Sequence, residues 1–170
     1  MATPSNTTHT VTSTLRVDLT ARETGAVAAV GESISVLRHV LLDGPTTRSS
    51  GTGAGEQDLV WSLSGLLGAA TPIVLPLSSL PSILDNQVRP FAALTAVVVR
   101  NRSAAGTINL SATAPVLTDP AASIVIEAGG LCLLTAPVDG WPVGAGTDTL
   151  TIATPAGQVA YDLLLLGKSQ

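Results

Sequence analysis

The stretch from Ile124 to Gly167 constrains the fold most strongly, because short apolar runs alternate there with tight turns. Glycine- or proline-containing turns separate four runs, which are Ile124–Glu127, Leu131–Thr135, Asp148–Ala153 and Gln158–Leu166. Gly129-Gly130 permits a positive φ at no steric cost, and Thr154–Gly157 has the Pro-then-Gly order of a tight turn. Runs this short, bounded by turn residues, predict β-strands rather than helices.

Further runs of the same kind precede this stretch, namely Val11–Leu19, Ser33–Leu42, Gln57–Leu67, Thr71–Leu77, Ala92–Arg100 and Thr107–Ala112. Pro72 and Pro76 predict that Thr71–Leu77 is an edge strand. Ala92–Arg100 contains three successive valines and no breaker, which predicts a strand buried on both faces and paired in a hairpin with Thr107–Ala112. Roughly ten short strands without an amphipathic helix predict an all-β fold, a β-sandwich or jelly-roll-like single domain.

The N-terminal part of the chain is predicted to be less regular. Residues 1–10 are rich in Thr, Ser and Asn and predict a flexible N-terminal arm, so the single β-sandwich domain is assigned to residues 11–170. Ala21–Val30 fits a short helix or a loop leading to Gly31, and we favour loop and strand because period-two alternation returns just after it. Asp43–Gly55 predicts a mobile surface loop, and Ser78–Asp85 predicts one helical turn.

The charge content argues against nucleic acid as a partner. Charged residues make up 12% of the chain, hydrophobic residues 45%, and the formal net charge is −4. Basic residues gather only at Arg100 and Arg102, which we interpret as a charged strand end at the surface, whereas nucleic-acid binding requires a basic patch. The apolar runs are too short for a membrane-spanning helix. The apolar excess therefore predicts burial against other subunits.

The side chains that carry nucleophilic or acid–base chemistry are few and scattered. The single cysteine, Cys132, lies in an apolar run and predicts a buried, inert thiol. His9 lies in the arm and His39 in an apolar strand, and no carboxylate in the sequence pattern marks either one as a catalytic base. The aromatic content of 2% leaves no sugar platforms for paired carboxylates. We therefore expect no catalytic residues and no enzymatic activity.

The sequence also predicts no cofactor and no metal site. Gly51, Gly53 and Gly55 have the spacing of a phosphate-binding loop, but no GK[ST] follows them. Asp139 and Asp148 flank glycine-rich turns, where a carboxylate is expected to cap backbone amides. No cysteine or histidine pair has metal-ligand spacing.

Two tryptophans and the arm supply the candidate assembly contacts. Trp61 alternates with Leu59 and Leu63, which predicts an aromatic side chain in the core or in a subunit contact. Trp141 lies in a Gly-Trp-Pro turn and is the sole candidate among the aromatic residues for an exposed position. The arm is predicted to lie on a neighbouring subunit. The candidate assembly contacts are Thr7, Thr8, Thr10, Trp61 and Trp141.

A series of turn-and-strand motifs runs from about Val36 to Gly167. In chain order they are Asp43-Gly44, Gly51–Asp58, Val60-Trp61, Val97–Asn101, Gly129–Pro137, Gly140–Ile152 and Tyr161–Gly167. In this order they resemble a family of small virion structural proteins of tailed bacteriophages. The family contributes no catalytic residue that could be carried over to this chain.

The resemblance implies a building block of the phage particle, made in the cytoplasm of the bacterial host. Within that class we expect a capsid decoration, or cement, protein that binds the major capsid protein on the outside of the shell. We expect it to be a homotrimer, with a dimer as the second choice. The alternatives are a tail, adaptor or head-fibre component, and a carbohydrate- or receptor-binding β-sandwich module.

Overall fold

The computed structural model describes residues 13–15, 18–27, 32–41, 46–48, 51–81, 88–113, 123–136, 138–144, 146 and 148–170; for those up to residue 48, it describes the backbone alone. Contacts divide the chain into two compact units, Thr12–Arg48 and a larger unit of Met1–Val11 with Ser49–Gln170. The single domain over residues 11–170 stays a prediction. All the regular structure in the described ranges is β-strand, and none of them contains a helix able to span a membrane.

The smaller unit consists of two antiparallel strand pairs. Strand β1 (Ser13–Leu15) pairs with β4 (Thr46–Arg48). Strand β2 (Asp18–Val27) pairs with β3 (Glu32–Leu41) over their full length. Strand β2 covers Ala21–Val27, so the strand in the preferred loop-and-strand interpretation of Ala21–Val30 is confirmed over these residues. The predicted loop Asp43–Gly55 contains strand β4.

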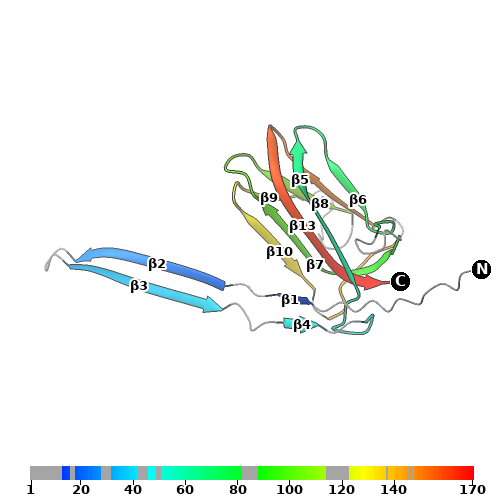
Figure 1. Ribbon diagram of the computed structural model, residues 1–170, viewed down its shortest axis with the longest axis horizontal. Helices are drawn as coiled ribbons and strands as arrows, with labels where there is room; N and C mark the ends of the chain where they lie inside the picture. Colours follow the sequence, from blue (N-terminus) through cyan, green and yellow to red (C-terminus); the bar gives the residue numbers. More distant parts are fainter. Residues whose placement is uncertain are drawn as a thin grey trace, which may run out of the picture. The chain divides into compact units, whose positions relative to one another are not determined.

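The larger unit contains two antiparallel sheets (Figure 1). One sheet has the order β10-β7-β13-β5, with β11 also paired to β7; we call it the five-stranded sheet. Its strands are β5 (Leu59–Gly68), β7 (Phe91–Asn101), β10 (Leu131–Thr135), β11 (Trp141–Pro142) and β13 (Gln158–Ser169). The four-stranded sheet has the order β6-β12-β8-β9. Its strands are β6 (Ile73–Pro76), β8 (Ile108–Ala112), β9 (Ile124–Ile126) and β12 (Thr149–Ala153).

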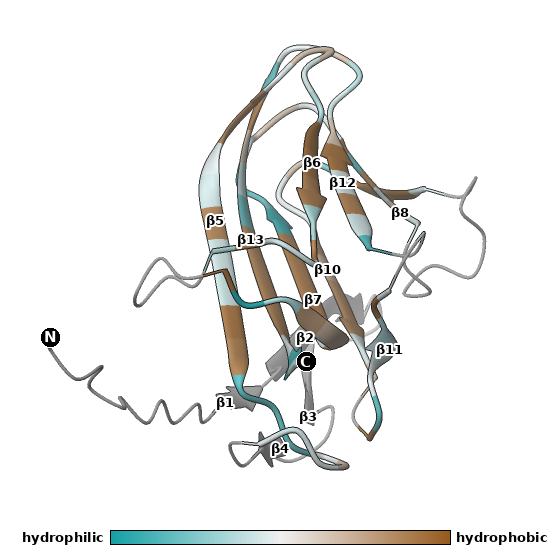
Figure 2. Ribbon diagram, turned by 90° about the vertical axis from the view of Figure 1, so that its right-hand side faces the viewer, coloured by the Kyte–Doolittle hydropathy of each residue, from teal (hydrophilic) through white to brown (hydrophobic). Residues whose placement is uncertain are grey.

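One hydrophobic core collects side chains from both sheets, which form two layers in Figure 2. Because facing residues of antiparallel strands share a face, the register places Trp61, Leu165, Val97 and Leu134 in one inward row of the five-stranded sheet. The four-stranded sheet contributes buried side chains at alternating positions, which are Leu75, Ile108, Leu110, Ile126, Leu150 and Ile152.

The two central strands of the five-stranded sheet are buried on both faces along part of their length. In β7 every residue from Ala93 to Val97 is buried, whereas Val98, in the middle of the valine run, is half-buried, so the predicted burial on both faces holds for part of the strand. In β13 the same holds from Leu165 to Lys168. Between the two strands, Thr95 is an extra residue on β7, because Leu166 faces Ala96 while Gly167 faces Leu94.

Most strands lie where the sequence predicted them, but they pair with strands more distant in the sequence than expected. The hairpin predicted between Ala92–Arg100 and Thr107–Ala112 does not form, because β7 pairs with β10, β11 and β13 while β8 pairs with β9 and β12. Strand β6 lies at a sheet edge, as its two prolines predicted. The described part of the predicted helical turn, 78–81, contains no helix, and the rest of that prediction lies outside the described residues.

Candidate assembly surface

The outer face of the five-stranded sheet is apolar. Residues that alternate with the inward rows form a row of Leu133, Val98, Leu164 and Ser62, and next to it a row of Thr135, Ala96, Leu166 and Val60. Leu133, Val98, Leu164 and Val60 are half-buried, whereas Ala96 and Leu166 are buried. We call these six residues the apolar face. An antiparallel sheet usually carries polar residues on the side away from its core, so this composition is unusual.

The outer face of the four-stranded sheet shows the usual composition. Its central strands β8 and β12 point hydroxyl and amide side chains away from the core, namely Asn109, Ser111, Thr149 and Thr151. Only Val74 and Val125, on the edge strands, are large apolar residues there, and both are exposed. The two sheets therefore differ in what they present outward, and the apolar face is specific to the five-stranded sheet.

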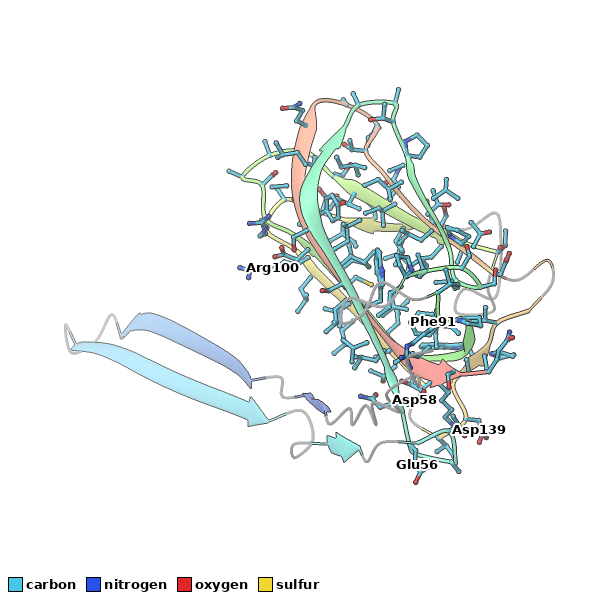
Figure 3. The ribbon with its side chains drawn as sticks, turned by 45° about the vertical axis from the view of Figure 1, so that its right-hand side comes forward. Glu56, Asp58, Phe91, Arg100 and Asp139 are labelled. Carbon is cyan, nitrogen blue, oxygen red and sulfur yellow. The ribbon has the colours of Figure 1, made fainter. Side chains whose placement is uncertain are left out.

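Two loops meet beside one end of the apolar face. The backbone oxygen of Val138 accepts a hydrogen bond from Lys168 Nζ at 3.1 Å and another from the Gly55 amide at 2.9 Å. The Asp58 carboxylate accepts hydrogen bonds from the Ser169 amide at 2.7 Å and the Ser169 hydroxyl at 2.5 Å. Figure 3 shows Asp58 and Asp139 at this end of the unit. These contacts hold the end of β13 in place, which explains why Lys168 is buried.

At the same end, the side chain of Glu56 fills the glycine-rich loop of which it is part. The amide of Gly53 donates to Glu56 Oε2 at 2.8 Å, and the Gly51 amide donates to the Gln57 carbonyl at 3.2 Å. A carboxylate of the chain therefore occupies the position at Gly53 that a bound phosphate would take. This arrangement supports the sequence argument against a phosphate loop.

The opposite end of the apolar face is charged. Arg100 and Arg102 are exposed, while Asn101 between them is buried, which confirms the predicted charged strand end. The Arg102 guanidinium lies 3.1 Å from the Asp162 carboxylate, which also accepts a hydrogen bond from the Ser64 hydroxyl at 2.7 Å. Exposed ion pairs of this kind contribute little to stability. These groups form a polar border at this end of the apolar face.

The apolar face is a small patch. Its residues lie on four strands about 4.8 Å apart and in rows about 7 Å apart, a footprint of about 300 Å² with the side-chain margins. Its solvent-exposed area is smaller than this footprint, because Ala96 and Leu166 are buried and the other four residues are half-buried. A stable protein–protein interface buries about 800 Å² on each partner. The apolar face alone is therefore too small to form a permanent interface.

Two of the five predicted contact residues are described, and neither belongs to the apolar face. Thr7, Thr8 and Thr10 lie outside the described residues. Trp61 is 8% exposed and belongs to the core, which is one of its two predicted positions. Trp141, the candidate for an exposed aromatic residue, is half-buried against the core and pairs with Leu94.

The thiol and phenol groups are shielded within the fold. Cys132 lies in an inward row with Val99 and Leu163 and is half-buried, less than the sequence predicted. Burial raises the pKa of the Cys132 thiol above its ordinary value, so the reactive thiolate is disfavoured. Burial also raises the pKa of the Tyr161 phenol. The side chains of His9 and His39 lie outside what the structure describes.

Among the described residues, no group of three or more His, Cys, Asp or Glu side chains is placed to hold a metal ion. Asp148, which was predicted to cap backbone amides, accepts hydrogen bonds from the hydroxyls of Ser78 and Thr149, at 2.8 and 3.3 Å. Two carboxylates that the sequence did not single out accept hydrogen bonds from backbone amides, Glu56 from Gly53 and Asp58 from Ser169.

Sequence reasoning missed the apolar face itself. A signal was present, because Leu163–Leu166 and Val97–Val99 are continuous apolar runs that place large apolar residues on both faces of a strand. We interpreted Val97–Val99 as part of a strand that is buried within the fold on both faces. The pairing of these two runs with each other joins their outward residues into one face.

Comparison with protein-family models, with curated proteins and with solved structures gave no match for this chain.

Proposed function

We propose that this chain is a capsid decoration protein of a tailed bacteriophage, which binds the coat-protein shell and stabilises it. The apolar face carries this proposal, because it offers an uncharged contact area beside a polar rim on a unit whose described residues hold no metal cluster. The order of the turn-and-strand motifs supports the phage assignment. The protein acts through binding and not through catalysis.

The strand order supports a finer description of the fold. We take the two sheets as a jelly-roll β-sandwich of eight principal strands, in which the first, third, sixth and eighth form one sheet and the others form the second. This order follows from counting β5, β6, β7, β8, β9, β10, β12 and β13 along the chain. Viral capsid proteins and lectins use jelly rolls, but the fold alone does not decide between such functions.

A carbohydrate- or receptor-binding module is the weaker alternative. Sugar platforms need exposed aromatic rings, and all four aromatic residues of the chain are described. Trp61, Phe91 and Tyr161 are buried, and Trp141 is half-buried against the core. A tail, adaptor or head-fibre protein would use the same kind of contact face. An experiment that compares binding to shells and to tails distinguishes this alternative from a decoration protein.

Co-sedimentation with empty shells of the coat protein encoded beside this chain tests the proposal. We expect the protein to pellet with the shells at a fixed ratio, since decoration proteins occupy repeated positions, and to raise the temperature at which the shells fall apart. Purified tails are the second target. Binding to tails with no binding to shells would replace decoration with the tail alternative, and binding to neither would refute both.

A matched pair of lysine substitutions tests the apolar face. Val98→Lys places a charge at its centre, whereas Thr151→Lys places the same charge on the outer face of the four-stranded sheet. Both positions are half-buried and lie on strands with a neighbour on each side. We expect Val98→Lys to weaken shell binding at least tenfold and Thr151→Lys to leave it unchanged, with both proteins folded by circular dichroism. Equal binding of the two variants would exclude the apolar face as the contact.

A further inference from the structure

Among the described strands of the larger unit, β5, β6, β9 and β10 lie at sheet edges, and β5 is the longest of them. Strand β6 has four residues and ends in Pro76, β9 has three residues, and β10 has five. Short edge strands and prolines are common protections, because a free strand edge invites pairing. Strand β5 is the exception among the described strands. It has ten residues, no charge and no proline, and it pairs with β13 over ten consecutive positions without a register shift.

The sequence of β5 is close to symmetric about Leu63. On either side of this residue stand Ser62 and Ser64, then Trp61 and Gly65, then Val60 and Leu66, and then Leu59 and Leu67. In an antiparallel pair of identical strands centred on Leu63, each of these residues faces its counterpart in the other copy. Serine would face serine, aliphatic would face aliphatic, and the large indole would face a glycine that leaves room for it.

Exposure along β5 shows that the strand lacks a neighbour. Leu66 is 67% exposed, the highest value among the exposed large apolar residues of the described chain. Leu63 is half-buried, although Leu59 and Leu67, which share its face, are buried. A second copy of β5 would cover Leu66 with Val60 and would bring the two Leu63 side chains together. Other registers match less well, since centring on Ser64 would place Trp61 against Leu67.

We propose that two copies of this protein pair through the free edges of their β5 strands, antiparallel and two-fold symmetric about Leu63. The pairing joins the two five-stranded sheets into one continuous sheet. A two-fold axis perpendicular to the sheet leaves both apolar faces on the same side, so the dimer presents the apolar faces of both copies in one direction. The pairing does not depend on the proposed binding to coat protein.

Cysteine cross-linking tests the contact and its register, in a Cys132→Ala background. Directly facing residues of antiparallel strands have Cα atoms about 4.5 or 5.5 Å apart, within the range a disulfide can bridge. We therefore expect Leu63→Cys to form a disulfide-linked dimer under mild oxidation. Ser62→Cys alone would link poorly, because its two copies are diagonal neighbours about 7–8 Å apart. A mixture of Ser62→Cys and Ser64→Cys proteins is expected to link readily. Val74→Cys, exposed on edge strand β6, is the control that stays unlinked.

A charge at the same edge tests the contact without cross-linking. Ser62→Lys changes an exposed residue on β5, and Ser123→Lys changes an exposed serine just before β9. By analytical ultracentrifugation we expect the wild type and Ser123→Lys to be dimers of about twice 17.1 kDa and Ser62→Lys to dissociate at least tenfold more readily.

Several results would overturn the proposal. A wild-type monomer at all accessible concentrations, together with unlinked Leu63→Cys, would show that β5 stays unpaired. A homotrimer insensitive to Ser62→Lys would restore the oligomer expected from the phage resemblance, which needs a different, head-to-tail contact. Loss of shell binding in a protein that still forms the Leu63→Cys dimer would refute the decoration function while leaving the pairing intact.

Discussion

Asn101 joins the two sheets through a single buried side chain. It ends strand β7, and its side-chain amide donates to the Gly106 carbonyl at 2.9 Å and to the Ile126 carbonyl at 3.2 Å. Its own oxygen accepts from the Ser103 amide at 3.0 Å. Ile126 belongs to the four-stranded sheet, so one fully buried residue fixes the turn after β7 and the position of β9.

We expect Asn101→Asp to destabilise the fold by about 3 kcal/mol at pH 7, because a buried carboxylate would face two carbonyl oxygens and lose both donors. This environment would raise the pKa of the new carboxyl group in the folded state. Stability would then be greater at pH 4, where the group is neutral, and would fall as pH rises through the raised pKa. Denaturant unfolding at pH 4 and pH 7 measures the difference.

Asn109→Asp is the matched control for this prediction. Asn109 lies on β8, half-buried on the outer face of the four-stranded sheet. The same change there should cost less than about 0.5 kcal/mol. An equal loss of stability in the two variants would mean that the buried hydrogen bonds of Asn101 do not hold the sheets together.

Strand β13 organises the five-stranded sheet. It pairs with β5 on one side and β7 on the other, and it carries both inward core residues and part of the apolar face. Gly167 is needed where β13 passes closest to β7, because a Cβ atom there would collide with the Ala93 carbonyl oxygen and the Phe91 ring. The Asp58 carboxylate then holds the last residues of the strand.

We expect Asp58→Ala to loosen the end of β13, since the Ser169 amide and hydroxyl lose a charged acceptor. Hydrogen bonds to charged groups contribute about 1.5–3 kcal/mol, so amide hydrogen exchange at Lys168 and Ser169 should accelerate at least tenfold. Exchange at Leu163, in the middle of the strand, should be unchanged.

Asp139→Ala provides the comparison, because Asp139 is exposed in the neighbouring turn. If both variants leave the exchange rates at Lys168 and Ser169 as they are in the wild type, the Asp58 contact is not what closes the end of the sheet.

At the scale of the whole molecule, the two units differ in how they are built. The larger unit has two sheets over a shared core, whereas the described residues of the smaller unit form two-stranded pairs. Isolated two-stranded hairpins are marginally stable in water. The β2–β3 pair is therefore expected to open far more often than the five-stranded sheet.

Limited trypsin digestion measures this difference. We expect cleavage after Arg22, Arg38 or Arg48 at least ten times faster than after Arg100, leaving a resistant fragment that begins at Ser49, as mass spectrometry would show. In denaturant the four sites should cleave at similar rates. Cleavage after Arg100 as fast as after Arg22 in the folded protein would show that the two units open together.

The sequence determined by itself that the chain is all-β and where most strands of the larger unit lie. Its short apolar runs and the Gly and Pro residues between them act locally, through backbone conformations that each turn permits. For the run Ala92–Arg100 the sequence predicted burial on both faces, which holds from Ala93 to Val97 but not at Val98, which is half-buried on the apolar face.

Only the tertiary structure decided which strands are neighbours. Phe91–Asn101 pairs with a strand more than fifty residues away rather than with the next run, because pairing is set by the shared core and not by proximity in sequence. The apolar face exists only through that pairing, which brings the outward side chains of Val98 and Leu164 into one row. The same strand order leaves one edge of β5 free, because among the described strands β5 has a neighbour, β13, on one side alone.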